Sequence, residues 1–436
     1  MKKTRVTLLK DAGPKVKASM CVMGLGQLMY GQIGKGLVYL AVLATGIYYL
    51  IARGFKDLAG LITLGTKEAN NWTKTAGDNS IIMLLMGILA IIAVILFAVI
   101  YVSNVKDAYA TQKLTERGSK PNSFRKDLAA LLDRNFYKTV LFFPILGVAV
   151  FSILPIIFMI CIAFTNYGGE IVPPKLVDWC GFANFAKLAS VSDIGPTFFK
   201  ILKWNIFWAI VSTVLNYFLG MGLALLLNKD CVKGRTIWRA FPILAYAMPG
   251  FITLLGFKFM FAYGGPINHL ITSLGGNAIG FLDIDAKWIA RILGILINTW
   301  LSVPGIMLLC TGLLANMDKN LHEAAKIDGA SRWKQFTSIT LPYMLFTTTP
   351  VLISQFIGNF NNFGIFFFLR NGLKTEGYFQ ASDTDLLINW LYNLSISNNY
   401  YNIGAAVSLI IFIITSIISL SVYIRSSAYK EEDTFQ

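Results

Sequence analysis

The chain alternates between long apolar runs and short polar segments, and this pattern predicts an all-α protein that crosses a membrane several times. The runs are near or above the ~18 residues that a membrane-spanning helix requires. We expect about eight such helices in one polytopic helical bundle. The predicted spans cover approximately residues 18–51, 80–102, 139–164, 203–227, 241–262, 289–314, 343–369 and 403–424.

Two of these spans are irregular. The first is long enough that it either crosses along its whole length or dips partly into the membrane. Its glycines, Gly24 and Gly26, have no third glycine in register and no preceding strand, so they predict close helix packing instead of a nucleotide-binding loop. In the fifth span, Pro242, Pro249 and Gly250 predict a kink.

Positive charge sets the predicted orientation. Eight basic residues in the loop after the second span place that loop in the cytoplasm. They are Lys106, Lys113, Arg117, Lys120, Arg125, Lys126, Arg134 and Lys138. Counting spans from this loop places the basic N-terminal tail and the C-terminal tail on the same side. The prediction is a multi-pass protein of the cell membrane with cytoplasmic N- and C-termini.

Composition agrees with a membrane protein and disfavours other classes. The chain is 55% hydrophobic and 14% charged, with a mean hydropathy of +0.60. Its net charge of +15 is spread along loops beside apolar runs, so we expect membrane lipid and no nucleic acid among its partners. The five cysteines form no CxxC pair, and His322-Glu323 lacks the second histidine of a zinc-protease motif. We therefore predict no catalytic residues and no metal site.

A polar segment at residues 318–342 lies between the sixth and seventh spans. Asp318 or Asn320 can cap a short helix, Ala324 and Ala325 favour it, and Gly329 suits its end. By these signals alone, the segment is a surface helix in a loop between spans. Its small central side chains would also let another protein approach the backbone closely.

Two spans carry carboxamides where polar groups are costly, because a buried amide without a partner loses its hydrogen bonds to water. On the sixth span, one helical face carries Asn298, Leu301, Ser302 and Gly305. On the seventh, one face carries Gln355, Gly358, Asn359 and Asn362. Either these groups bond one helix to another, or they bind a ligand.

A sugar is a suitable ligand for such faces. Its hydroxyls both donate and accept hydrogen bonds, and a carboxamide can answer both. Trp300, Phe360 and Phe363 stand beside the carboxamides and could stack on the apolar faces of sugar rings. An intramembrane enzyme would instead need paired acidic, His or Cys groups inside the spans, and the sequence has almost none.

The segment between the two spans resembles the EAA loop of ABC importer permeases. The resemblance lies in Glu323-Ala324-Ala325, Asp328-Gly329-Ala330 and the later Ile339-Thr340-Leu341-Pro342. It implies a coupling helix that docks in a cytoplasmic ATPase, with contacts from Glu323, Ala324, Ala325, Asp328 and Gly329. It also implies a transport subunit that is not an enzyme and holds no cofactor, with ATP and Mg²⁺ bound by the partner ATPase.

The carboxamide segments resemble those of the carbohydrate-uptake branch of this family, and most closely its maltose and maltodextrin permeases. Asn298-Thr299-Trp300-Leu301 and Asn359-Phe360-Asn361-Asn362-Phe363 carry the resemblance, which implies sugar contacts from Asn298, Leu301, Asn359 and Asn362. Three positions depart from the family pattern: Ser302, Gly305 and Gln355. We keep Ser302 and Gln355 as candidate contacts, and the missing ring at Gly305 would widen the cavity.

The resemblance also implies domains and partners. Residues 138–436 would form a six-helix permease core of the type I importer fold, with the coupling loop at 318–342. Residues 1–137 would add a tail, two helices and the basic loop. Partners would be a second homologous permease, two copies of an ABC ATPase and an extracellular sugar-binding lipoprotein. The cargo is then maltose or maltodextrin, or another oligosaccharide or a polyol; sequence leaves the sugar and the role of the two added helices open.

Overall fold

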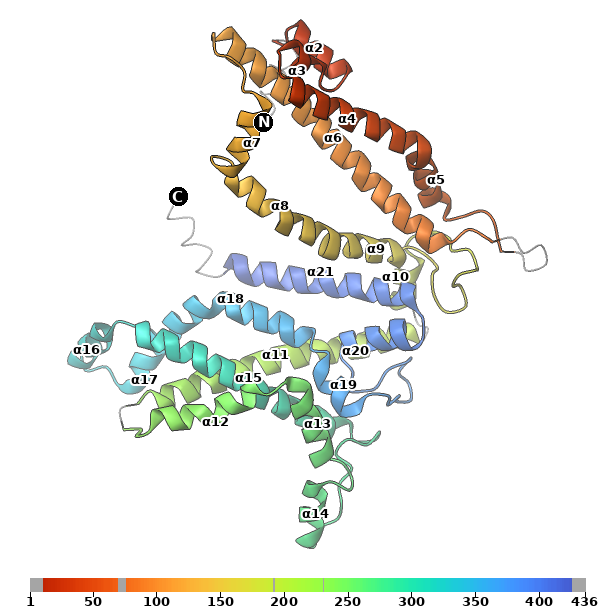
Figure 1. Cartoon of the computed structure of the whole chain (residues 1–436). Coiled ribbons are helices and arrows are strands. Elements are labelled where there is room, and N and C mark those ends of the chain that lie inside the picture. Colours follow the sequence, from red (N-terminus) through yellow and green to blue (C-terminus); the bar gives the residue numbers. More distant parts are fainter. Residues whose placement is uncertain (1–10, 70–75, 191–192, 230, 426–436) are drawn as a thin grey trace. The chain divides into compact units, whose positions relative to one another are not determined.

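Helices make up the regular secondary structure of the computed structural model (Figure 1), which describes all residues except 1–10, 70–75, 191–192, 230 and 426–436. The charged ends of both predicted tails lie outside the described residues. Between helices, the described residues include two isolated bridges, Thr165 with Trp179 and Gly168 with Ile171. The chain divides into two compact units, Met1–Gly181 and Phe182–Gln436.

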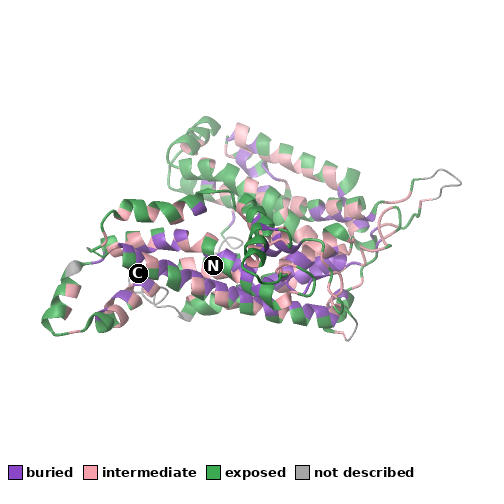
Figure 2. Ribbon diagram, turned by 90° about the horizontal axis from the view of Figure 1, so that it is seen from below, coloured by how far each residue is buried: buried purple, intermediate pink, exposed green. Residues whose placement is uncertain are grey.

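Seven helices among the described residues are long and apolar enough to cross a membrane, and a bent pair brings the number to eight if it forms one span. This confirms the predicted polytopic all-α bundle. Many large apolar side chains, such as Phe143 and Phe151, are exposed along these helices (Figure 2). Exposed apolar side chains of this kind suit contact with lipid. The seven helices are Ile33–Thr63, Ser80–Glu116, Phe136–Ala163, Ile194–Leu227, Lys287–Asn316, Arg332–Arg370 and Tyr401–Ile424.

The first unit contains eight α-helices and two π-helical turns among its described residues. They are α2 (Pro14–Cys21), α3 (Leu25–Met29), α4 (Ile33–Tyr49), η1 (Leu50–Gly54), α5 (Phe55–Thr63), α6 (Ser80–Glu116), α7 (Phe124–Leu132), α8 (Phe136–Val148), η2 (Ala149–Ile153) and α9 (Leu154–Ala163). The bounds predicted for the first span, 18–51, were wrong at both ends.

The chain before Ile33 forms two short helices because glycines interrupt it. Gly24 has φ +85° and Gly31 has φ +79°, a left-handed conformation that other residues avoid. A Cβ on Gly24 would lie 2.2 Å from the Gly36 carbonyl oxygen, so the predicted close packing by glycine is confirmed. At the other end, the helix continues past Arg53, where we predicted a loop, because α5 packs on α6 with Leu61 against Gly87.

A polar cluster ties the short helices to α6. The Asn104 side chain donates to the Ser19 carbonyl (3.0 Å) and the Gln27 side chain donates to the Asn104 carbonyl (3.0 Å), all buried. Lys35 on α4 pairs with Asp107 on α6 (2.9 Å) and with Asp127 on α7 (2.7 Å). Buried amides that satisfy one another in this way fix the register of the helices they join.

The second unit holds the remaining helices. They are α10 (Ala183–Ala189), α11 (Ile194–Leu227), α12 (Arg235–Ala247), α13 (Gly250–Met260), α14 (Pro266–Ser273), α15 (Lys287–Asn316), α16 (Lys319–Ile327), α17 (Arg332–Gln335), η3 (Phe336–Thr340), α18 (Leu341–Phe360), α19 (Gly364–Arg370), α20 (Leu387–Tyr392), η4 (Asn393–Ser397) and α21 (Tyr401–Arg425). Helix α11 packs against α15 and α18. A buried cluster that includes Tyr217, Met307 and Met344 joins these three helices.

The predicted kink in the fifth span is confirmed, and it is a full break. Helices α12 and α13 meet at 92°. Pro249 lacks the N–H that would continue the helix, and Met248 before it takes an extended conformation (φ −78°, ψ 141°). Pro242, by contrast, lies inside α12 without ending it.

Candidate functional site

Three of the predicted carboxamides lie together in the second unit. The Asn362 side chain donates to Oδ1 of Asn298 (3.0 Å), and the Asn298 side chain donates to Oδ1 of Asn359 (3.2 Å). Asn359 in turn donates to the Thr213 hydroxyl on α11 (3.0 Å). We call Asn298, Asn359, Asn362 and Thr213 the carboxamide cluster. It joins α15, α18 and α11 in the middle of the bundle.

Asn362 does not lie on the helical face that we predicted. Helix α18 ends at Phe360, and Asn362 follows in the short break before α19. Its Oδ1 accepts the Ile365 amide (3.3 Å), which satisfies one of the free N–H groups that open α19. Asn298 and Asn359 are buried, whereas Asn362 is half-buried. In this conformation the cluster therefore does both things: it bonds helices together, and it presents one accessible carboxamide.

Helix α11 supports the break, and we had not predicted this. Trp208 donates its indole N–H to the Asn359 carbonyl (3.0 Å), and Asn205 donates to the Phe360 carbonyl (3.1 Å). These bonds satisfy carbonyls at the end of α18 that have no partner within the helix. Asn205, Ser212 and Asn216 recur on one face of the fourth predicted span, and this spacing was the signal that could have found the support.

The other predicted contacts lie outside the cluster. Leu301 and Ser302 are half-buried on α15 and take no part in these hydrogen bonds. Oε1 of Gln355 is buried and has no hydrogen-bond partner among the described residues. A Cβ on Gly305 would lie 3.4 Å from the Tyr246 ring of α12. The Tyr246 ring thus borders the space beside Gly305. The absence of a ring at position 305 therefore does not leave this space open in the way that we predicted.

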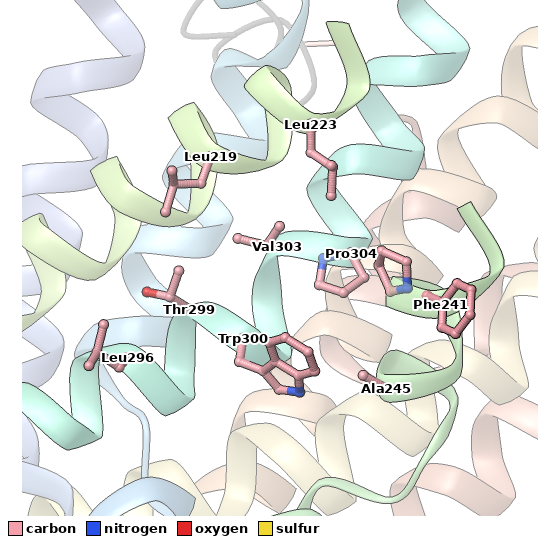
Figure 3. A pocket seen from close by; sticks show the side chains of 10 residues that line it. Leu219, Leu223, Phe241, Ala245, Leu296, Thr299, Trp300, Val303 and Pro304 are labelled. Atoms are coloured by element: carbon pink, nitrogen blue, oxygen red, sulfur yellow. The ribbon is translucent and has the colours of Figure 1, made fainter. Parts of the chain in front are cut away.

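A cavity of about 540 Å³ lies next to the cluster (Figure 3). Helices α11, α12 and α15 line it, and Thr299 and Trp300 directly follow Asn298 of the cluster. Trp300 is exposed and its ring faces this space, as Figure 3 shows. The Thr299 hydroxyl is buried without a hydrogen-bond partner among the described residues. The lining is thus mainly apolar, with two aromatic rings and the hydroxyl of Thr299, and small-molecule pockets are usually mainly apolar with few polar groups.

Trp300 and Phe241, both exposed, are the aromatic side chains of this lining that can stack on a ligand. Phe360 is 0% exposed, so the stacking that we predicted for its ring is wrong in this conformation. Phe363 packs between Phe367 (ring centroids 4.4 Å apart) and Tyr392 (5.2 Å). Both phenylalanine rings thus pack around the break between α18 and α19, and neither lines the cavity.

The polar segment at residues 318–342 begins with the short helix α16, as predicted. Asp318 caps it by accepting the Asn320 amide (2.9 Å). The helix ends at Ile327, and Gly329, with φ +76°, follows its C-cap. The chain turns after α16, and the Gln335 side chain stabilises this turn by donating to the Ala330 carbonyl (2.8 Å). Glu323, Ala324, Asp328 and Gly329 are exposed, and Ala325 is half-buried. The small residues at the centre of the segment are therefore accessible.

Large apolar side chains surround these small residues. Ile327 is 86% exposed at the end of α16. Trp333 is 73% exposed in the first turn of the helix Arg332–Arg370, where its ring lies beside that of Phe336 (ring centroids 5.6 Å apart). Ile327 therefore stands free of both a protein core and a span, and such side chains often mark a surface that another protein covers. The segment thus has the shape and the chemistry of a docking surface.

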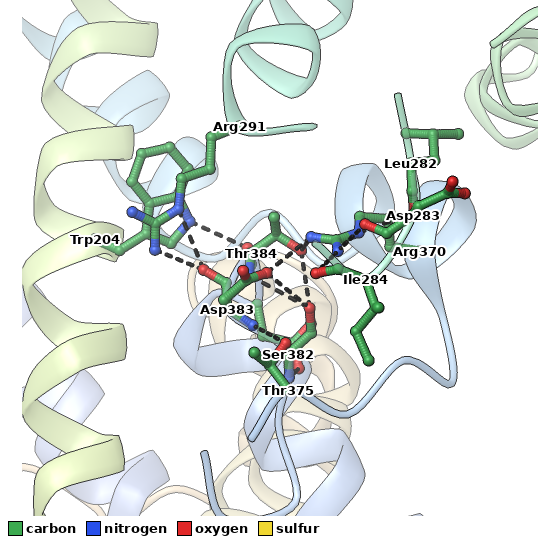
Figure 4. Close-up of polar contacts among 11 residues, drawn as sticks. Trp204, Leu282, Asp283, Ile284, Arg291, Arg370, Thr375, Ser382, Asp383 and Thr384 are labelled. Atoms are coloured by element: carbon green, nitrogen blue, oxygen red, sulfur yellow. Dashed lines mark hydrogen bonds and ion pairs between the residues drawn. The ribbon is translucent and has the colours of Figure 1, made fainter. Parts of the chain in front are cut away.

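At the opposite end of α15, a buried ionic network fixes the loop of residues 371–386 on the bundle (Figure 4). Arg370 pairs with Asp383 (2.8 Å) and also donates to the carbonyls of Asp283 and Leu282. Arg291 on α15 donates to the Asp383 carbonyl (3.2 Å). The Arg291 guanidinium lies 4.1 Å from the centre of the Trp204 ring. A buried pair with its remaining donors satisfied is costly to break.

The carboxyl of Asp385, in the same loop, predicts a pH effect on stability. Burial raises the pKa of Asp385 to about 7, although the Ser382 amide and the Arg370 charge act against the increase. An unfolded aspartate titrates near pH ~4, so the folded chain binds this proton more tightly. The stabilisation is complete below pH ~4 and is lost as the pH rises from about 4 to about 7.

We therefore expect the thermal unfolding temperature of the purified complex to fall between pH 5 and pH 8. In Asp385→Asn this dependence should weaken, because the amide oxygen can still accept the bonds from Ser382 (2.9 Å) and Asn393 (3.1 Å) without a charge. Asp178→Asn, at an exposed carboxyl in the first unit, is the matched control. An equal pH dependence in wild type and Asp385→Asn would contradict the assignment.

Comparison with known proteins gives three kinds of match. Residues 217–426 match the model of the family described as "Binding-protein-dependent transport system inner membrane component". The maltodextrin transport system permease protein MalC of Streptococcus pneumoniae is 35% identical over 98% of this chain and 99% of its own length. The galactooligosaccharides transport system permease protein GanP of Bacillus subtilis is 32% identical over 94% and 97%.

The third match is structural. A crystal structure of a bacterial ABC transporter involved in the import of the acidic polysaccharide alginate gives a TM-score of 0.56, with 21% identity. The match covers 68% of this chain and 96% of that chain. At this identity it shows a shared fold.

Proposed function

Because the chain belongs to the binding-protein-dependent inner membrane components of carbohydrate-uptake ABC importers, we propose that it carries malto-oligosaccharides across the membrane. It is a multi-pass permease component and not the ATPase, and its transporter works with a binding protein and an ATPase. The observation that carries the proposal is the likeness to a maltodextrin permease over nearly the whole length of both chains.

The proposed mechanism is alternating access. The binding protein delivers the sugar on the outside, and this chain, paired with a second homologous permease, holds it near mid-membrane. Asn362, with Asn298 and Asn359 behind it, would exchange its internal hydrogen bonds for bonds to sugar hydroxyls, and Trp300 would stack on a ring. Leu301, Ser302 and Gln355 are the further proposed contacts. The unpaired Oε1 of Gln355 supports this, because a buried acceptor without a donor is ready to take one.

The proposed link to ATP runs through α16. Two copies of the ATPase bind ATP and Mg²⁺ and close on each other. The exposed residues Glu323, Ala324, Asp328 and Gly329, with the half-buried Ala325 and the apolar Ile327 beside them, would sit in a cleft of one ATPase and follow its movement. With this mechanism α16 and both termini would lie in the cytoplasm, as the basic loop around Lys120 also predicts. The permease core would be 138–436, and residues 1–137 an addition to it.

The nature of the sugar can be tested with the complete transporter in proteoliposomes. ATP hydrolysis is measured while the binding protein is added empty, with maltotriose or with a galactooligosaccharide. We expect maltotriose to stimulate hydrolysis and to be taken up. If only the galactooligosaccharide stimulated hydrolysis, the transported sugar would be a galactooligosaccharide. The likeness to GanP supports this second candidate. A purified chain that moved sugar without an ATPase would contradict the mechanism.

A further inference from the structure

A second cavity, of about 350 Å³, lies at the end of α15 that is remote from α16. The first turn of α15, the early turns of α11 and Tyr378 of the 371–386 loop line it. Neither the carboxamide cluster nor α16 contributes a residue to this lining. Its lining combines several cations with aromatic rings.

Four positive side chains line this cavity: Lys200, Lys203, Lys287 and Arg291. None of the described residues that line it is acidic. Asp383, the nearest acid in the network of Figure 4, gives its carboxylate to Arg370 and only its carbonyl to Arg291. None of the ion pairs among the described residues includes one of the three lysines. Like charges at a membrane interface repel one another, and a bound anion would relieve this repulsion.

The rings beside the cations indicate where the cavity lies in the membrane. Lys287 and Trp288 open α15, and both belong to the lining. Tryptophan and lysine at the end of a span are typical of the headgroup region, where the ring stays at the interface and the ammonium reaches water. The anion held here would thus be at headgroup depth.

Helix α11 extends the site toward the membrane interior. On one face, Lys200 and Lys203 are followed by Phe207, Ile210 and Val214 at helical spacing, and these three apolar side chains are each about half exposed. The charges at the end of the helix suit the headgroup of an anionic amphiphile, and the apolar surface next to them suits its hydrocarbon chains. A free phosphate ion or an acidic peptide would use the charges and leave the apolar track empty.

We propose that this cavity binds the phosphate group of an anionic phospholipid, with the acyl chains along Phe207, Ile210 and Val214. The lipid would sit in the leaflet remote from α16. It would hold together α11, α15 and the 371–386 loop, which approach one another at this point. Lys200 already donates to the Gly377 carbonyl of that loop (3.0 Å), so Lys203 and Lys287 are the cations most available to the phosphate.

The test is lipid binding to the complete transporter, measured by native mass spectrometry with phosphatidylglycerol or phosphatidylcholine. We expect wild type to retain phosphatidylglycerol preferentially. Lys203→Gln with Lys287→Gln should weaken this retention roughly 10- to 30-fold, because each lysine near an anionic headgroup contributes substantially. Lys187→Gln with Lys258→Gln removes the same charge from exposed positions outside the cavity and should retain lipid normally.

Two further measurements test whether charge and a lipid headgroup are both required. Lys203→Arg with Lys287→Arg keeps the charge and should retain phosphatidylglycerol, which separates loss of charge from loss of fold. Inorganic phosphate in excess should not displace the lipid. Equal retention of both lipids, an equal loss in the control pair, or displacement by inorganic phosphate would each overturn the proposal. The sugar specificity of the transporter does not enter these measurements, so the proposed function can fail independently.

Discussion

Replacing Gly329 with tryptophan is expected to leave the transporter assembled in the membrane but to abolish sugar uptake, while ATP hydrolysis loses its dependence on the loaded binding protein. Gly329 has φ +76°, where another residue costs ~1–2 kcal/mol. A Cβ there would meet no atom within 4 Å, so the new side chain would enter open space. The fold tolerates this change, whereas a partner seated on α16 would not.

The control for this prediction is Gly118→Trp. Gly118 has nearly the same conformation (φ +75°), is exposed and would also have no neighbour within 4 Å of an added Cβ, but it lies in the loop after α6. The backbone strain is therefore matched. Uptake of labelled maltotriose and ATP hydrolysis are measured in both variants. Uptake in Gly329→Trp that equals uptake in Gly118→Trp would contradict the docking role of α16.

The number and order of the membrane-crossing helices were predictable because a membrane span has a simple requirement. A run of apolar residues long enough to cross lipid must be helical, since lipid offers no partner for backbone groups. The helix α16 was predictable too, because Asp318 and Gly329 mark its ends by local chemistry. Local signals of this kind need no knowledge of the rest of the fold.

Helix ends and partners across the bundle were less predictable. The end of α18 at Phe360 depends on Asn205 and Trp208, which lie far earlier in the chain, at sequence separations of 155 and 151. Phe360 looked like a ligand-facing ring beside a carboxamide, yet it is buried by α11. A helical wheel shows which residues share a face, but it does not show which other helix covers that face.

The roles of the carboxamides were the hardest to predict, because one side chain can serve both packing and binding. Asn359 donates to Thr213 and accepts from Asn298, so Asn359→Leu would leave the buried Asn298 amide nitrogen without its acceptor. The Thr213 hydroxyl, by contrast, keeps its own bond to the Ala209 carbonyl (2.7 Å). A buried donor without an acceptor costs about 1–3 kcal/mol. We expect this variant to reduce the amount of assembled complex, and its uptake would then report assembly and binding together.

Asn362→Leu separates the two roles. Asn362 is half-buried at the accessible side of the cluster. Its loss removes the donor to Asn298 Oδ1 (3.0 Å) and the acceptor of the Ile365 amide (3.3 Å), so we expect somewhat less assembled complex and compare uptake per complex. If it binds sugar, uptake per assembled complex should fall at least about tenfold, the effect of one hydrogen bond to a buried polar group. Transport of labelled maltotriose, divided by the amount of complex that co-purifies with its ATPase, is the measurement.

Asn361→Leu is the matched control, one residue earlier. Asn361 is also half-buried, but its side chain donates back to the Ile357 carbonyl of its own helix (3.2 Å) and takes no part in the cluster. The same substitution should leave uptake per complex nearly unchanged. If Asn362→Leu instead lowers only assembly and each surviving complex transports normally, the cluster bonds helices and does not hold cargo. The sugar contacts would then lie beside Trp300, in the cavity that α12 helps to line, because that cavity offers an exposed ring close to the cluster.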